Sequence, residues 1–472
     1  MGKYKYLLKN IGLVTINNFT SKILAFLLVP LYTNVLSTAE YGTYDLYTTT
    51  AFLLIPILSV DIAEALVRFL LDENVDEKEV FTISIRYYIR ACLICLVLVI
   101  ANKIFNIVPM FNQYVWYFFG YFVLCMLSDI MNQFTRGKEQ LVDMAIAGIL
   151  NSIMTIVLNI LFLLYLHWGL EGYFLASNIS FATSSIFLMI RTKAWKYIKY
   201  SPINKNTSRE MRQYSMPLIL NNIAWWINNV SDRYIVIWLC GVAANGIYSV
   251  AYKIPSILTM FQTIFNQAWT LSAVKEYDEN NSEFYENIYK IYNSGMVIIC
   301  SGLIIFNKVI ARILFANEFY KAWEYAPFLM ISVVFGSLGA VIGGIFTATK
   351  KSAIIGKTTF VGAVTNIVLN FILVYKIGPL GAAIATMISY VVVWAIRVRA
   401  VNNIISFRIN HKRNNISYGI LLVQAIAMVM ITNIMPLILV EIVCCLIVCS
   451  LYFSEVKGIV KSVVNKKLKK GI

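Results

Sequence analysis

Three basic residues lie in stretches that are otherwise apolar enough to cross a membrane. Lys22 lies near the middle of a span predicted over residues 11–36, while Arg233 and Lys253 lie in spans predicted over 214–240 and 245–270. A charge inside a span costs roughly 2.5–3.5 kcal/mol on insertion scales, so it needs a reason. Such cations suit the binding of an anionic group in a wet cavity, and a buried structural ion pair is the alternative.

The depth of each cation separates the two interpretations only in part. Lys22 is about eleven residues, or roughly 16 Å, from either membrane surface, which is far for a lysine side chain to reach. Arg233 and Lys253 lie seven and eight residues from the outer ends of their spans. Their side chains can therefore snorkel to the surface, and position alone does not decide their role.

Helical spacing extends the candidate site beyond the cations. Asn222, Trp226, Asn229 and Arg233 follow one another at intervals of 4, 3 and 4, which places them on one helix face. Asp232 lies on a second, neighbouring stripe for which a structural role is the alternative. The residues that we expect to bind or translocate the substrate are Lys22, Arg233, Lys253, Asn18, Asn222, Trp226, Asn229 and Asp232.

Other chemistry is poorly supported by the sequence. Cys92 and Cys95 form a C-x-x-C inside an apolar span, and His167 and His411 lie in connections elsewhere, so we expect no metal or redox site. There is no phosphate-binding glycine loop or nucleophile elbow, and we expect no catalytic residue and no cofactor.

Two groups of charged residues have a simpler interpretation. Glu64 and Arg68 are spaced as an i, i+4 pair that, with Asp61, closes the second predicted span. We interpret them as a solvated helix end and the acidic run over residues 72–79 as a solvated loop.

The elements that must position the candidate residues are membrane helices. Hydrophobic residues make up 59% of the 472 residues and charged residues 14%, against roughly 45–50% and 25% in soluble domains. We predict an all-α polytopic membrane protein. Its predicted spans, about fourteen, lie near residues 11–36, 41–66, 80–104, 112–134, 144–166, 170–191, 214–240, 245–270, 287–311, 325–348, 354–376, 379–396, 416–434 and 436–454.

The sequence repeats over most of its length. Asn17, Asn18, Gly42 and Tyr44 recur 204 residues later as Asn221, Asn222, Gly246 and Tyr248, and further pairs are Asn159 with Asn370, Gly169 with Gly378, and Gly172 with Gly381. This predicts two parallel six-helix repeats, the usual architecture of a transporter. We expect an N-terminal lobe over 1–200, a second lobe over 201–400, and an additional helix pair with a basic tail over 401–472.

The basic residues are distributed unequally about the spans. The net charge is +16, and 32 of the 40 Lys and Arg residues fall on the side that holds the N-terminus. This is the positive-inside pattern, which predicts that both termini are cytoplasmic and argues against a nucleic-acid partner. The tail over 461–470 is expected to contact acidic lipid headgroups.

Short motifs in the second lobe resemble a known family. Asp232–Ile235, Gly241 and the run over 244–254 resemble a signature of bacterial polysaccharide flippases, the O-antigen and lipid-linked oligosaccharide translocases. These are members of the multidrug, oligosaccharidyl-lipid and polysaccharide exporter superfamily. The first-lobe version is Ala39–Tyr44, and Asn317–Tyr320 with Ala322 also fits.

The resemblance implies two lobes around a central cationic cavity that opens alternately to each side. Members carry basic residues on the first helix of each lobe and on the eighth span, which are the places of Lys22, Arg233 and Lys253 here. The expected function is movement of undecaprenyl-diphosphate-linked oligosaccharide from the cytoplasmic to the outer leaflet of the bacterial inner membrane, for O-antigen or capsule synthesis. A monomer can do this work, and a polysaccharide polymerase is a candidate partner.

Three alternatives remain open at this point. A cation-coupled multidrug extruder of the same fold generally needs a membrane carboxylate, whereas the first span offers Lys22 and no acid. A membrane glycosyltransferase or polysaccharide polymerase would need an enlarged outer loop with catalytic groups. A membrane scaffold would not require central cations.

Overall fold

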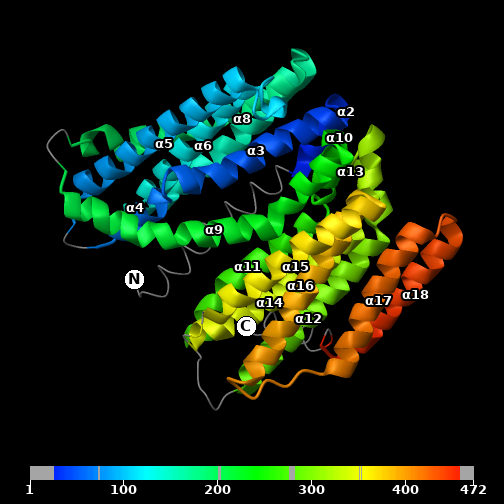
Figure 1. Cartoon of the computed structure of the whole chain (residues 1–472). Helices are drawn as coiled ribbons and strands as arrows, with labels where there is room; N and C mark the ends of the chain where they lie inside the picture. The colour runs from blue at the N-terminus through cyan, green and yellow to red at the C-terminus, as the bar shows by residue number, and fades with distance from the viewer. Residues whose placement is uncertain are drawn as a thin grey trace, which may run out of the picture. The chain divides into compact units, whose positions relative to one another are not determined.

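The protein is built from helices, grouped in two compact units. The computed structural model describes residues 26–72, 75–199, 203–275, 282–349, 351, 353–455 and 457, and no strand occurs in this part of the chain. The units are Met1–Val230 and Ser231–Ile472, and Figure 1 shows their helices in chain order. The all-α fold predicted from composition is therefore confirmed, whereas the predicted boundaries at 200 and 400 stay predictions.

The first unit consists of a helical bundle and the first part of a long helix. Its helices α6 and α7 pack on α8, and α4 and α5 pack on α6. Tyr44 on α3 stacks on Tyr173 of α8 with ring centroids 3.8 Å apart, and its hydroxyl lies 2.6 Å from Ser177 Oγ. The elements are α2 Val29–Val35, α3 Thr38–Leu58, α4 Ile62–Leu70, α5 Glu77–Phe105, η1 Pro109–Phe111, α6 Val115–Gly137, α7 Leu141–Asn159, η2 Ile160–Tyr165, α8 Gly169–Thr192, η3 Ala194–Tyr197 and the beginning of α9 Lys205–Cys240.

The second unit is arranged around α14, whose most apolar window is 83% buried. Helices α11, α12, α16 and α17 pack against α14, and α15 packs against α16. The last two helices, α17 and α18, pack on each other and on α12. The elements after α9 are α10 Val242–Ala251, α11 Pro255–Lys275, α12 Ser282–Ile305, α13 Asn307–Leu314, η4 Asn317–Glu324, α14 Ala326–Ala348, α15 Ala353–Ile377, α16 Pro379–Asn402, α17 His411–Met430 and α18 Ile434–Leu451.

The number of membrane spans is smaller by a strict criterion than the number predicted. In the described residues, nine helices are long and apolar enough to cross a membrane, or up to ten if α3 and α4, which meet at 58°, form one broken span. Each of the fourteen predicted spans overlaps at least one helix, the first of them through α2 alone. A count of fourteen therefore stays a prediction.

The internal repeat is visible in the backbone at matched glycines. Gly169 and Gly378 both adopt positive φ, 52° and 64°, directly before or at the start of the last helix of each repeat. One turn on, a Cβ at Gly172 would lie 2.9 Å from Phe162 Cβ, and one at Gly381 would lie 2.3 Å from the Leu373 carbonyl. These glycines therefore allow the helix to turn back closely on the preceding one in both repeats.

A matched pair of asparagines supports the same repeat. Asn159 and Asn370 are both fully buried. Asn159 Nδ2 donates to the Thr155 carbonyl at 2.6 Å, and Asn370 Nδ2 donates to the Asn366 carbonyl at 2.9 Å. The two side chains thus occupy equivalent places in α7 and α15 with the same local hydrogen bond, which is what a duplicated lobe predicts.

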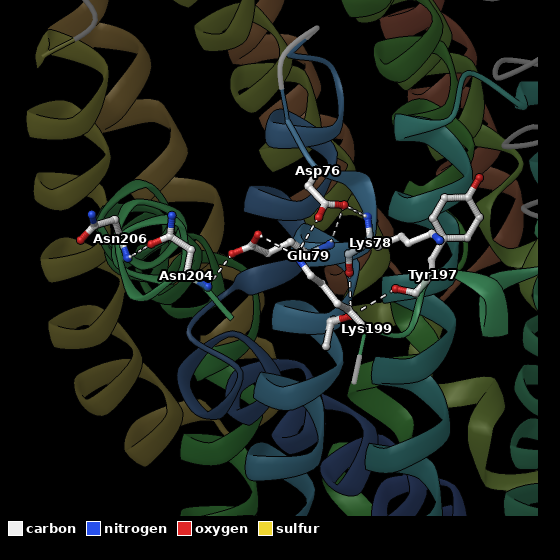
Figure 2. A network of polar contacts seen from close by, with 8 residues as sticks. Asp76, Lys78, Glu79, Tyr197, Lys199, Asn204 and Asn206 are labelled. Atoms are coloured by element: carbon white, nitrogen blue, oxygen red, sulfur yellow. Dashed lines mark hydrogen bonds and ion pairs between the residues drawn. The ribbon is translucent and has the colours of Figure 1, made fainter. Parts of the chain in front are cut away.

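The connection that leads into α9 is fastened to the first unit. Asp76 caps α5 by accepting from the backbone amides of Lys78 and Glu79. Lys199 Nζ donates to Asp76 at 2.9 Å, and the Asn204 amide donates to Glu79 at 2.7 Å (Figure 2). The hydrogen bond from Lys199 lowers the pKa of Asp76. This part of the predicted solvated acidic loop is thus a polar anchor for the connection.

Candidate substrate-translocation site

Two of the candidate residues cannot be placed. Lys22 and Asn18 belong to the first 25 residues, which lie outside the described residues. Their role in a cationic cavity therefore stays a prediction. The repeat still relates Asn18 to Asn222 and Lys22 to Trp226 in sequence.

Asn222 and Trp226 form hydrogen bonds to α3 and to the break between α3 and α4. Asn222 Nδ2 donates to Asp61 Oδ2 at 2.9 Å, and Trp226 Nε1 donates to the Thr49 carbonyl at 3.0 Å. Both side chains are partly buried. The predicted stripe is therefore a face of α9 that, over these two residues, is bound to α3 and to the break that follows it.

Polar side chains from distant parts of the sequence form hydrogen bonds at and just after the break between α3 and α4. Asp61 adopts φ 51° and its side chain is only 8% exposed. Glu64 accepts from Gln133 Nε2 of α6 at 2.7 Å, and Arg68 instead pairs with Asp72. Arg68 is thus an exposed residue that pairs with Asp72, as a solvated helix end predicts, whereas the prediction is wrong for Asp61, which is buried. The long-range partner, Gln133, carries no local sequence signal that identifies it.

Asp232 lies in a buried cluster of hydroxyl donors in the second unit. It is 1% exposed, and its Oδ2 accepts from the hydroxyls of Tyr248 at 2.6 Å, Tyr252 at 2.7 Å and Thr386 at 3.3 Å. The backbone amide of Arg233 donates to Oδ1 at 2.9 Å. Donors on several elements converge on this side chain, so both of its buried oxygens have hydrogen-bond partners.

Of the two basic candidates in the second unit, Arg233 packs on the ring of Tyr252, and Lys253 follows Tyr252 in the sequence. The Arg233 guanidinium carbon lies 5.3 Å from the centroid of the Tyr252 ring, a cation–π geometry. Lys253 follows Tyr252 in the turn between α10 and α11, so the predicted eighth span is interrupted at this cation. Both basic side chains are partly buried. The structure thus gathers Asp232 and Arg233 around Tyr252 and places Lys253 at the adjacent break.

Asn229 makes a local contact instead. Its Nδ2 donates to the Trp225 carbonyl one turn earlier at 2.7 Å, and its side chain is partly buried.

Tyr248, Tyr252 and Thr386 were missed by the sequence analysis as site residues. Tyr248 repeats Tyr44, and Tyr252 follows one turn later, which was an available signal; Thr386 is 154 residues from Asp232 and had none.

The fold and the charges inside it define a polytopic membrane transport protein with an internal repeat. A model of the family described as polysaccharide biosynthesis protein matches residues 7–270, and the MatE model matches residues 217–372. Because the first match covers more than half of the chain, the chain belongs to the polysaccharide biosynthesis protein family, within the superfamily of multidrug, oligosaccharidyl-lipid and polysaccharide exporters.

Individual relatives share the sequence and the fold. The probable low-salt glycan biosynthesis flippase Agl15 of Haloferax volcanii is 25% identical over 341 residues, covering 69% of this chain and 71% of that protein. The lipid II flippase MurJ, in an inward closed conformation, has a similar fold, with a TM-score of 0.73, 17% identity and coverage of 93% and 98% of the two chains. An inward-facing multidrug resistance MATE transporter has a TM-score of 0.65 and 15% identity over 81% and 95%.

Proposed function

We propose that the protein is a flippase that moves polyprenyl-diphosphate-linked oligosaccharide from the cytoplasmic to the outer leaflet of a membrane. The observation that carries this proposal is Arg233, a partly buried cation held over Tyr252 in a member of the polysaccharide biosynthesis family. A relative named as a probable glycan biosynthesis flippase and the shared fold with a lipid II flippase support it.

The physical demands of this substrate match the proposed residues. Each sugar hydroxyl that loses water without a new partner costs several kcal/mol, so the oligosaccharide needs a polar path. The diphosphate carries about two negative charges, for which Lys22, Arg233 and Lys253 are suitable partners. Asn18, Asn222, Trp226 and Asn229 are proposed to line the same path. Asp232 is proposed to position Tyr252 beneath Arg233.

The membrane potential is a sufficient source of energy for outward movement. With the inside negative by about 100 mV, outward movement of two negative charges gains roughly 4.6 kcal/mol. The finer proposal is an undecaprenyl carrier and a bacterial inner membrane, with both termini cytoplasmic, and a role in O-antigen or capsule synthesis. The protein would act as a monomer by alternating access and could deliver its product to a polysaccharide polymerase.

A cation-coupled multidrug extruder is the second candidate function. It is favoured by the match of residues 217–372 to the MatE model and by the buried carboxyl groups of Asp61 and Asp232. The cations argue for an anionic substrate, because a cationic drug beside Arg233 and Lys253 would be repelled.

The two functions are separated by transport in liposomes. We expect purified protein to move a fluorescent polyprenyl-diphosphate oligosaccharide between leaflets without ATP and faster with an inside-negative potential. The matched control is a neutral polyprenyl glycoside, which keeps the lipid chain and a sugar but lacks the charged diphosphate. Efflux of a cationic dye without any movement of the diphosphate lipid would overturn the flippase and support the extruder.

A further inference from the structure

The last two helices contain an acid in the interior of the helix pair. Glu441 lies seven residues after the start of α18, or about 10 Å along the helix axis. Gln424 lies six residues before the end of the neighbouring α17. Glu441 is 1% exposed and Gln424 is fully buried. This pair lies outside the two repeats, and the proposed transport mechanism does not use it.

Glu441 and Gln424 share one hydrogen bond, and each has one oxygen without a donor in the part of the chain that the structure describes. Gln424 Nε2 donates to Glu441 Oε2 at 2.8 Å. Within the described residues, the two remaining oxygens, Glu441 Oε1 and Gln424 Oε1, are buried and have no hydrogen-bond partner. Two acceptors that lack a donor are left on opposing side chains, one from each helix. A single proton on Glu441 Oε1 would supply the donor that Gln424 Oε1 lacks.

Among the residues that the structure describes, Glu441 has no ion-pair partner to stabilise a negative charge. Lys308, at the start of α13, interacts electrostatically with Glu441, and Cys444 is the neighbouring titratable group on α18. The Lys308 ammonium lies 4.3 Å from the centroid of the Trp323 ring, so an aromatic face is its close contact. No Lys308–Glu441 ion pair occurs among the described residues. Within the described part of the chain, an ionised Glu441 would be buried and would accept a hydrogen bond from one amide alone, that of Gln424.

Glu455, a second buried acid just beyond the same helix, provides a comparison because basic side chains pair with it. The side chain of Glu455, beyond the end of α18, is 3% exposed and lies 2.7 Å from Arg413 and 3.2 Å from Lys290. Burial opposes ionisation, but hydrogen bonds from Ser454 and Arg413 outweigh it and lower the pKa of Glu455 to about 2. Glu455 has two cations, whereas Glu441 has a neutral amide.

We propose that Glu441 is a proton-binding site, held as a neutral carboxylic acid that donates from Oε1 to Gln424 Oε1 while Oε2 accepts from Gln424 Nε2. The acid and the amide then form a closed pair of hydrogen bonds that joins α17 to α18. The bound proton removes a charge from the apolar interior and satisfies both unpaired oxygens. The site does not depend on which substrate the protein transports.

Infrared difference spectroscopy on the full-length protein in lipid nanodiscs at neutral pH tests the protonation state. The carbonyl stretch of a protonated carboxyl is separated from the carboxylate stretches. We expect the wild-type minus E441Q spectrum to contain one protonated-carboxyl band and no loss of carboxylate intensity. E441Q keeps an amide donor toward Gln424 Oε1, so the variant should fold. The matched control E455Q should lose carboxylate intensity and leave the protonated band unchanged.

A second variant tests the partner. Q424L removes the hydrogen bonds to the acid, so the Glu441 band should move to higher frequency while the repeats remain intact. If E441Q instead removes carboxylate intensity, Glu441 is ionised and the proposal is overturned. If that carboxylate signal responds to added Na⁺, a metal cation occupies the place of the proton, which also contradicts the proposal.

Discussion

Asp232 is held by donors that come from α9, from α10 and the turn after it, and from α16. Its Oδ2 accepts from two tyrosine hydroxyls and from Thr386, and its Oδ1 accepts from the Arg233 amide. Tyr252 also lies under the Arg233 guanidinium. At the scale of single residues, the carboxylate therefore fixes an aromatic ring, and the ring in turn orients a cation. Asp232 is best explained as a positioning residue.

Replacement of Asp232 should lower the stability of the protein. Two replacements of Tyr252 should distinguish the contribution of its ring to transport from that of its hydroxyl. Asp232→Ala leaves buried hydroxyls unpaired, at about 1–3 kcal/mol for each, and should lower the melting temperature in detergent. Tyr252→Phe keeps the ring but loses the hydroxyl that Asp232 accepts from, so it should slow transport. Tyr252→Leu also loses the ring beneath Arg233 and should slow transport further. A stable Asp232→Ala variant, or equal transport by Tyr252→Phe and Tyr252→Leu, would contradict this role.

The residue scale is also where sequence analysis was weakest. The spacing of Asn222, Trp226 and Arg233 correctly placed them on a shared helix, α9. It could not show that Asn222 and Trp226 donate to Asp61 and to the Thr49 carbonyl, because these partners lie 161 and 177 residues away. Helical phase assigns a face to a side chain, but packing between distant segments decides what that face contacts.

At the scale of elements, the repeats share their tight helix turns but differ in the second segment. The first repeat has its break after α3, at Asp61, whereas the second has its break at Lys253, between α10 and α11. Subtraction of 204 places Lys253 at Thr49, inside α3. Pro255 at the start of α11 was an available sign of the second break. Val60 and Asp61, both at positive φ, carry no such sign because neither is glycine.

Gly381 provides a direct test of the tight turn that both repeats contain. A Cβ at this position would lie 2.3 Å from backbone atoms of Leu373, which cannot move as a side chain would. We expect Gly381→Ala to lower the free energy of unfolding by about 1–3 kcal/mol or more.

The matched control for this prediction is Gly419 on α17, where an added Cβ meets nothing within 4 Å. Gly419→Ala should be neutral or slightly stabilising, because alanine favours the helix. Thermal unfolding in detergent, monitored by tryptophan fluorescence, measures both. Equal melting temperatures for the two variants would show that the close approach at Gly381 is not a constraint.

At the scale of the whole molecule, composition and the internal repeat predicted more than any single motif. The apolar composition predicted an all-helical membrane protein, and the family match and the similar fold of a lipid II flippase confirm the superfamily. Such properties depend on the average of many residues, so one unexpected contact does not change them. The substrate depends on a few charges, and the sequence leaves their arrangement open because Lys22 and Arg233 are 211 residues apart.

The central claim is that intramembrane cations carry the diphosphate of a lipid-linked oligosaccharide. The most direct measurement is the initial rate of leaflet exchange of this lipid in liposomes for wild type and for the double variant Lys22→Ala/Arg233→Ala. We expect at least a tenfold slower rate for a folded double variant, which corresponds to about 1.4 kcal/mol in the barrier. An unchanged rate would contradict the cationic site.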